Sequence, residues 1–295
     1  MAYVNQVIGR SKAEMTAAEA PYKDTPVLDF IAYVQAEAVR KALAGGEHAK
    51  LPVLSQASCF SRTAAVPAGE VTIRSMAALY PFDNTLEARI LTGKQLRDYL
   101  EFSARYYVRT PAGGPVDPAK LTNADGIPDY NYDAVSGVSY EIDIAREPGR
   151  RIGKLLFEGK PVADDARFVL AVNNYRASGG GNFPHVAKAP QVWSTSEEIR
   201  NVIINWVKET GEIDGARFAS VDWRLTRDGV RCSEVRRTYG QGFRPYGRPR
   251  CPCVRRLGRA GQGFSMRVEL GRGAAVRGGE GRRPKVVKAV RAGRG

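Results

Sequence analysis

The composition of this chain changes abruptly after Thr226, and this break limits which part can fold around a core. Residues 227–295 carry 19 lysine and arginine residues against 4 acidic ones, whereas residues 1–226 carry 26 against 27. The last segment is rich in arginine and glycine, lacks helical or strand periodicity, and has too little apolar sequence for a core. We therefore predict one folded domain over residues 1–226 and a disordered basic tail over residues 227–295.

The basic tail allows two interpretations. It could be a nucleic-acid-binding arm whose arginines contact phosphates. It could also be frameshifted translation of GC-rich DNA, which yields arginine, glycine, proline and alanine. We favour the second because the arginine and glycine spacing is irregular, so we expect no nucleic-acid partner through the tail. We do not expect a zinc site at Cys232, Cys251 and Cys253, because a fourth ligand and paired spacing are missing.

Apolar spacing in residues 1–226 predicts an α+β domain with a mixed sheet and packed helices. The three clearest helices begin at Asp24-Thr25-Pro26, at a capping box of Thr92 and Gln95, and near Ser194 or Thr195. Strands are expected at 51–55, around 88–90, and at 136–143, 152–157, 168–172 and 221–225. The turn at 158–161 predicts that strands 152–157 and 168–172 pair with each other. Residues 109–134 predict a long loop, a kind of segment that often carries function.

Other features narrow the class of protein. No apolar run is long enough to cross a membrane, so we expect no membrane partner. The N-terminal residues show no apolar segment typical of a secretion signal. Cys59 is the single cysteine of the predicted domain and cannot form a disulfide framework within it. His48 and His185 lie far apart in no ligand-spaced motif, so we predict neither catalytic nor metal-binding residues.

The stretch from Phe168 to Phe183 is the strongest candidate for a binding site. An apolar run ends in Asn173-Asn174-Tyr175-Arg176, and three glycines follow at 179–181. Glycine lets a backbone turn tightly and come close to a ligand. An aromatic side chain beside such a loop can hold a planar ring that carries hydroxyl groups. The alternative is a plain strand-to-loop turn with Tyr175 in the core.

A second aromatic loop, Tyr80-Pro81-Phe82-Asp83-Asn84-Thr85-Leu86, accompanies the first, and both occur with further motifs in one order. These motifs are Leu51-Pro-Val-Leu-Ser55, Gly69-Glu-Val-Thr-Ile-Arg74, Thr92-Gly-Lys-Gln-Leu96 and Ser136-Gly-Val-Ser-Tyr-Glu-Ile-Asp143. Together they make residues 1–226 resemble the C-terminal, substrate-binding domain of bacterial 5'-nucleotidases and 2',3'-cyclic-nucleotide 2'-phosphodiesterase/3'-nucleotidases. The resemblance implies nucleotide catabolism by phosphate-ester hydrolysis.

The resemblance also implies a set of substrate-binding residues. Phe82 and Tyr175 match the two aromatic residues that sandwich the base, and each stacked face contributes about 1–3 kcal/mol. Asn84 matches an asparagine that hydrogen-bonds the base edge. Gly179, Gly180 and Gly181 match the segment near the ribose, Arg62 falls near an arginine that faces the phosphate, and Arg176 is a charged neighbour of the stacking residue. The expected partner is a nucleotide or nucleoside.

The catalytic part of that family is a separate N-terminal metallophosphoesterase domain, which holds two divalent metal ions. Its Asp-x-His, Gly-Asn-His-Glu and Gly-His-x-His motifs do not occur in this sequence. We therefore expect no cofactor in this chain and no hydrolysis by it alone, with the metal domain as a partner if it is encoded separately. The alternatives left open are a nucleic-acid-binding protein acting through the tail and a non-functional gene remnant. The family acts outside the cytoplasm, but the missing signal peptide leaves localisation open.

Overall fold

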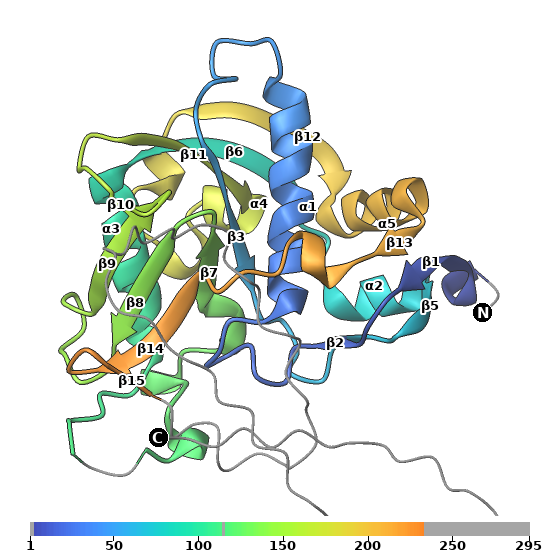
Figure 1. Ribbon diagram of the computed structural model, residues 1–295. Coiled ribbons are helices and arrows are strands. Elements are labelled where there is room, and N and C mark those ends of the chain that lie inside the picture. The colour runs from blue at the N-terminus through green and yellow to red at the C-terminus, as the bar shows by residue number, and fades with distance from the viewer. Residues whose placement is uncertain (1–2, 114–115, 233–295) are drawn as a thin grey trace, which may run out of the picture. The chain divides into compact units, whose positions relative to one another are not determined.

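The computed structural model describes residues 3–113 and 116–232, which form a mixed α+β fold as the sequence predicts (Figure 1). This part of the chain contains four sheets and five α-helices. No helix within these ranges is both long enough and apolar enough to cross a membrane. We predicted that the tail is disordered and interpreted it as a nucleic-acid-binding arm or as frameshifted translation. Residues 233–295 of this tail lie outside the described residues.

The central sheet is built around β11, a strand buried on both faces. The strand order is β12 (Gln191–Glu198), β6 (Thr85–Thr92), β11 (Arg167–Asn173), β3 (Val53–Ser58) and β7 (Asp133–Ser136). Val169 and Ala171 point into one hydrophobic core, and Phe168, Leu170 and Val172 point into another. A continuous apolar run is what a strand with two covered faces requires. The predicted buried strand at 168–172 is therefore confirmed.

The remaining strands form one larger and two smaller sheets. The larger has the order β10 (Lys160–Pro161), β9 (Ile152–Phe157), β8 (Ser139–Asp143), β14 (Trp223–Arg227) and β15 (Val230–Arg231). The smaller ones join β13 (Glu212–Ile213), β1 (Val7–Ser11) and β5 (Gly69–Thr72), and β2 (Met15–Thr16) with β4 (Ala65–Val66). The β14–β15 hairpin continues past residue 226, where we predicted the domain to end; that boundary stays a prediction.

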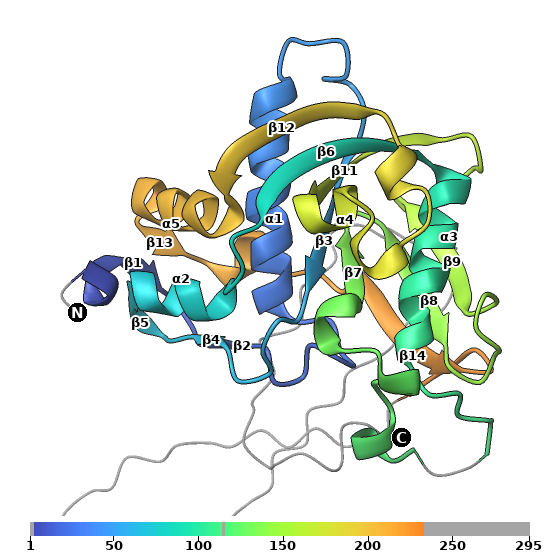
Figure 2. The ribbon, with the colours of Figure 1, turned by 180° about the vertical axis from the view of Figure 1, so that it is seen from behind.

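The helices cover the two faces of the central sheet. They are α1 (Pro26–Leu43), α2 (Ile73–Leu79), α3 (Gly93–Ser103), the single turn α4 (Asn174–Ala177) and α5 (Ile199–Thr210). The first core takes its side chains from α1, α2, α5 and one face of the sheet. The second takes them from α3, the β8–β9–β14 strands and the other face. Figures 1 and 2 show α1 lying along the sheet over β3 and α3 on the far side beside β9.

Two helix signals in the sequence are confirmed by hydrogen bonds. The Gln95 N–H donates to the Thr92 hydroxyl (3.2 Å), and the Gln95 side chain accepts from the Thr92 N–H (2.9 Å), which is the predicted capping box. Gly211 ends α5 with φ 70°, and its N–H donates to the Val207 carbonyl (2.8 Å). A left-handed residue at this position favours glycine.

The predicted strand at 136–143 is wrong in one respect, because it is two strands in different sheets. Gly137, at φ 96°, turns the chain between β7 and β8. A side chain at this position would also come within 2.9 Å of Leu54. The alternation of apolar residues continues across the turn, which is why the two strands look like one in the sequence.

The predicted pairing of strands 152–157 and 168–172 is also wrong. Glu158 and Gly159, with φ of 48° and 77°, form a tight turn that sends β10 back against β9. The chain then crosses to the central sheet, where β11 pairs with β6 and β3. Two strands that are neighbours in sequence therefore belong to different sheets.

The third predicted helix begins later than Ser194 or Thr195. Residues 191–198 form β12, which pairs antiparallel with β6, and α5 begins at Ile199. The cap-forming residues at 194 and 195 are part of an edge strand because Val192 and Trp193 pack against the first core. Pairing with a distant strand outweighs the local helix signal here.

Candidate functional site

Four loops meet at one edge of the central sheet. β11 ends where β6 begins, with Asn173 opposite Leu86, and β3 ends where β7 begins, with Ser58 opposite Asp133. Because β3 and β11 run parallel, both ends lie at the same edge. The loops at 59–62, 80–84, 129–132 and 174–182 therefore come together, and α4 in Figure 2 marks the place. A hydrogen bond from the Thr85 N–H to the Asn174 side chain (3.2 Å) joins two of them.

Exposed aromatic side chains gather at this edge. Phe82, Tyr130 and Tyr175 are 44%, 43% and 42% exposed, and the remaining strongly exposed aromatic residue of the described part is Tyr3. Large apolar side chains left in water at one place typically mark a binding site. The structure thus brings the two predicted stacking residues to the same sheet edge and adds Tyr130, which our sequence reasoning missed.

The Phe82 ring is held by its neighbours. Its centroid lies 5.2 Å from that of Phe60 and 6.3 Å from that of Tyr130, both in edge contacts. Arg200, in α5, donates to the Asp83 carboxylate (2.6 Å) and fixes the loop from behind. The ring is exposed, yet its loop is anchored.

The glycine loop is shaped by the Tyr175 ring. A Cβ at Gly180 would lie 2.4 Å from the Cε2 atom of Tyr175, so only glycine lets the ring lie there. Gly179 and Gly181 have φ of 97° and 73°, which favour glycine. A Cβ at Gly181 would also come within 2.7 Å of the Arg176 guanidinium. The three predicted glycines are therefore needed for different reasons.

Arg176 ties the loops together and is 1% exposed. Its guanidinium forms a two-point ion pair with Asp133 (2.7 and 2.9 Å). It also donates to the Tyr130 carbonyl (2.7 Å), the Asn131 side chain (3.1 Å) and the Gly180 carbonyl (3.2 Å). These contacts use its donors on the protein itself. We therefore treat Arg176 as a residue that positions the loops rather than one that reaches a ligand.

Arg62 lies at the same edge, and its side chain is 41% exposed. Its Nε and Nη2 atoms donate to Asp129 (2.6 and 2.8 Å), and Nη2 also reaches Asn123 (2.8 Å). Burial acts to raise the pKa of Asp129, but hydrogen bonds from Arg62, Tyr106 and Asn123 outweigh it and lower that pKa to about 2. The described residues leave the Nη1 atom of Arg62 without a hydrogen bond. The predicted contact of Arg62 with a phosphate stays a prediction.

Asn84 lies directly before β6 and is half-buried. Its side-chain nitrogen donates to the Tyr80 hydroxyl (3.5 Å), and its backbone carbonyl accepts from the Ile199 N–H (2.8 Å). Burial raises the pKa of Tyr80 to about 12, so this hydroxyl stays protonated. The position beside Phe82 agrees with the predicted contact to a base edge, which stays a prediction.

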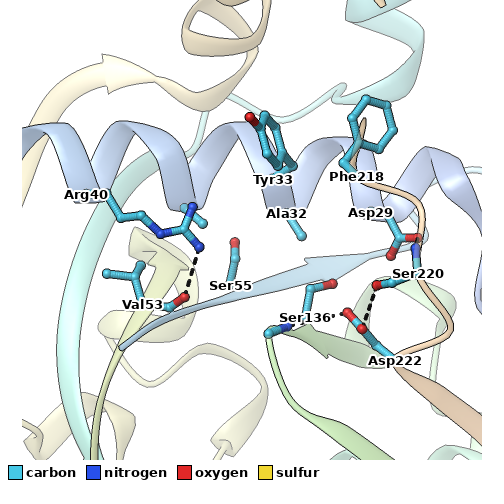
Figure 3. A pocket seen from close by; sticks show the side chains of 12 residues that line it. Asp29, Ala32, Tyr33, Arg40, Val53, Ser55, Ser136, Phe218, Ser220 and Asp222 are labelled. Atoms are coloured by element: carbon cyan, nitrogen blue, oxygen red, sulfur yellow. Dashed lines mark hydrogen bonds between the residues drawn. The ribbon is translucent and has the colours of Figure 1, made fainter. Parts of the chain in front are cut away.

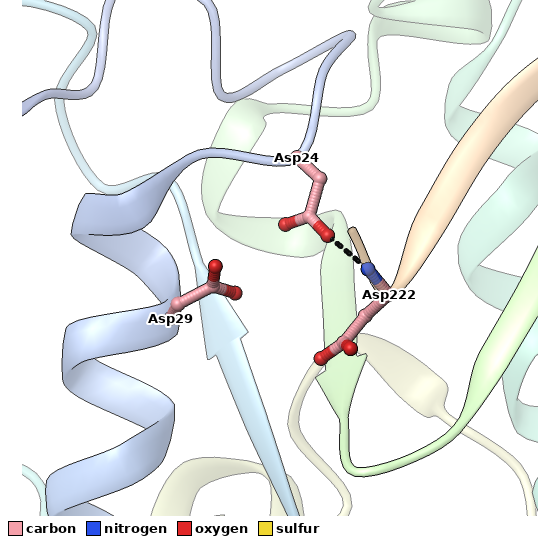
Figure 4. Close-up of side chains that lie close together, drawn as sticks. All are labelled: Asp24, Asp29 and Asp222. Atoms are coloured by element: carbon pink, nitrogen blue, oxygen red, sulfur yellow. Dashed lines mark hydrogen bonds between the residues drawn. The ribbon is translucent and has the colours of Figure 1, made fainter. Parts of the chain in front are cut away.

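Two features of the described residues bear on metal binding. His48 lies 3.9 Å from Glu47, and His185 lies 2.9 Å from Asp98, so the two histidines are in separate places. The one group of potential ligands close enough to share an ion within the described ranges is Asp24, Asp29 and Asp222, with oxygens within 4.8 Å of one another (Figure 4). Three carboxylates without histidine do not match a two-metal phosphoesterase centre.

The three aspartates have a simpler explanation. Burial, followed by the charge of Asp222, raises the pKa of Asp24 to about 7, and burial with the charge of Asp24 raises the pKa of Asp29 to about 9. Retained protons therefore relieve the repulsion. A neighbouring cavity of about 160 Å³ lies between α1, β3 and residues 218–222 (Figure 3), and none of the predicted site residues lines it.

The fold is of the α+β class and carries exposed aromatic side chains at one edge of its central sheet. The sequence pattern of the family "5'-nucleotidase, C-terminal domain" matches residues 7–188. The chain belongs to this family and corresponds to its C-terminal, substrate-binding domain, which confirms the predicted resemblance.

Named relatives agree with this assignment. The chain is 32% identical over 232 residues to the trifunctional nucleotide phosphoesterase protein YfkN of Bacillus subtilis. This alignment covers 70% of this chain and 15% of that protein. It is 33% identical over 250 residues to a 2',3'-cyclic-nucleotide 2'-phosphodiesterase/3'-nucleotidase of Salmonella typhimurium. This alignment covers 76% of this chain and 38% of that protein. The chain thus spans less than two fifths of the length of either relative.

Solved structures show the same fold. A putative 5'-nucleotidase from Staphylococcus aureus matches with a TM-score of 0.61 at 25% identity, over 76% of this chain and 41% of that one. A 5'-nucleotidase precursor from Thermus thermophilus matches with a TM-score of 0.61 at 20% identity, over 76% and 40%. The second likeness supports the fold alone.

Proposed function

We propose that this domain binds nucleosides and nucleotides by stacking the base between Phe82 and Tyr175. The observation that carries the proposal is the pair of half-exposed aromatic side chains on two loops at one sheet edge, joined by the Thr85–Asn174 hydrogen bond. Every base has two π faces, so stacking accepts different bases. The family assignment and the nucleotide phosphoesterases among the relatives support this ligand class.

The other predicted residues have roles in this proposal. Asn84 hydrogen-bonds the base edge from the start of β6, and the glycine loop at 179–181 lies along the ribose. Arg62 pairs with a phosphate through its free Nη1 face while Asp129 holds the rest of its guanidinium. An anion held by arginine gains from charge-assisted hydrogen bonds.

The stacking contact is tested by titrating the full chain with adenosine, which carries no phosphate to bind basic residues. We expect Tyr175→Ala and Phe82→Ala each to weaken binding by about 5- to 150-fold, since a stacked base is worth about 1–3 kcal/mol. Tyr3→Ala removes an exposed ring of another part of the fold and serves as control. Equal dissociation constants for Tyr175→Ala and the unaltered chain would contradict the proposal.

We further infer that the domain does not hydrolyse phosphate esters alone. In its sequence the histidine-rich metal motifs are missing, and its two histidines lie in separate places. With Mn²⁺ or Mg²⁺ and 2',3'-cyclic AMP or 3'-AMP, the full chain should release product no faster than buffer. Addition of a separately encoded metallophosphoesterase domain is the positive arm, and turnover by the chain alone refutes this inference.

A further inference from the structure

Tyr130 is an exposed aromatic residue of the long loop before β7 to which the proposed function gives no role. It lies in the 3-10 turn Asp129–Asn131, and its ring centroid is 6.3 Å from that of Phe82 at an interplanar angle of 65°. Phe60 makes a second edge contact with Phe82 at 5.2 Å and 71°. Aromatic rings prefer such edge-to-face contacts, which are directional. Phe82 is therefore held by one partly buried neighbour, Phe60, and one exposed neighbour, Tyr130.

The backbone around Tyr130 is fixed from both sides. The residue before Tyr130 is Asp129, whose carboxylate accepts hydrogen bonds from Arg62 (2.6 and 2.8 Å) and from the Tyr106 hydroxyl (2.6 Å). The Tyr130 carbonyl accepts a hydrogen bond from Arg176 (2.7 Å), and so does the side chain of the next residue, Asn131. The ring thus projects into solvent from a turn anchored by two arginines.

The hydroxyl of Tyr130 does not stabilise the described part of the fold through a hydrogen bond. Among the described residues nothing hydrogen-bonds its hydroxyl, whereas the hydroxyls of Tyr99 and Tyr106 are bonded to Asp133 and Asp129. An anchored turn that presents an aromatic ring to water resembles a preorganised binding contact more than a core residue.

We propose that Tyr130 is a positioning residue of the base site, which holds the exposed side of the Phe82 ring in the orientation that stacks on a base. This inference rests on the proposed function. Without Tyr130, Phe60 is the one aromatic ring of the described residues left in contact with Phe82, and the Phe82 ring has more freedom to rotate before binding. Ordering it then costs part of the stacking energy.

The test uses the full chain and measures the dissociation constant of adenosine by calorimetry. Tyr130→Ala should weaken binding about 2- to 13-fold, the range set by an aromatic pair of about 0.5–1.5 kcal/mol. Tyr130→Phe keeps the ring and should stay close to the unaltered chain. Tyr3→Ala is the control for loss of an exposed ring elsewhere. Unchanged affinity for Tyr130→Ala overturns the proposal.

A double-mutant cycle separates positioning from general damage. If Tyr130 acts through Phe82, then Tyr130→Ala should have little further effect in a Phe82→Leu background, where there is no ring to orient. Additive losses would instead show an effect independent of Phe82 and reject the proposal. Failure of this inference is distinct from failure of the proposed function: in the first case Tyr175→Ala still weakens adenosine binding, and in the second it does not.

Discussion

The glycines of the site are required for different structural reasons, which could not be read from the sequence alone. Gly179 and Gly181 have backbone angles that favour glycine, whereas Gly180 is needed because the Tyr175 ring lies where a side chain would be. This makes Gly180 the residue through which the position of the ring can be changed without touching the ring.

Gly180→Ala is expected to displace the Tyr175 ring and weaken adenosine binding by up to roughly 150-fold, the loss of one stacked face. Gly153→Ala is the matched control, because a Cβ there meets nothing within 4 Å. The measurement is the adenosine dissociation constant, with thermal unfolding to check the fold. Equal affinity in the two variants would show that the ring does not depend on Gly180.

Arg176 illustrates what the sequence could not reveal about a residue. Next to a stacking tyrosine, a charged side chain predicts a ligand contact. Its partner, Asp133, is 43 positions away in sequence and lies beside it only because β3 pairs with both β7 and β11. A buried arginine needs such a carboxylate, since an unpaired charge in the core is costly. Tyr130 was missed for the same reason.

At the scale of elements, the sequence predicted best where the signal is local. β11 is apolar from Phe168 to Val172, and α1 and α3 carry their own start signals, so these elements were predicted correctly. The sequence-based prediction was wrong at β12 and β10, because these strands form only by pairing with β6 and β9. The loops that carry the aromatic residues follow strand ends, so the site could be expected, while its third aromatic residue lay in a long loop without periodicity.

At the scale of the whole molecule, three aspartates join the start of the fold to its end. Asp24 accepts hydrogen bonds from the Asp222 and Trp223 N–H groups (2.6 and 3.3 Å), and Asp29 accepts from the Ser220 N–H (3.1 Å). They attach α1 and its preceding turn to the segment that leads into β14. Stability of the domain should therefore depend on their protonation.

The expected dependence on pH follows from the raised pKa values of Asp24, about 7, and Asp29, about 9. The native state keeps protons that the unfolded chain loses near pH 4, so the stability from these groups is complete below that pH and is lost as pH rises to about 9. Asp29→Asn keeps a donor and cannot ionise. Its unfolding temperature relative to the unaltered chain should therefore rise steadily between pH 5 and pH 9.

Asp165→Asn, at an exposed position, is the control and should show a constant difference. A constant difference for Asp29→Asn as well would mean that Asp29 is ionised throughout.

The pairing of distant strands also governs when the domain can form. β11 must insert between β6 and β3, both made about a hundred residues earlier, and β14 must pair with β8 after a similar delay. Contacts this far apart along the chain slow folding. During synthesis, strands β3, β6 and β8 therefore keep unpaired edges until β11 and then β14 leave the ribosome.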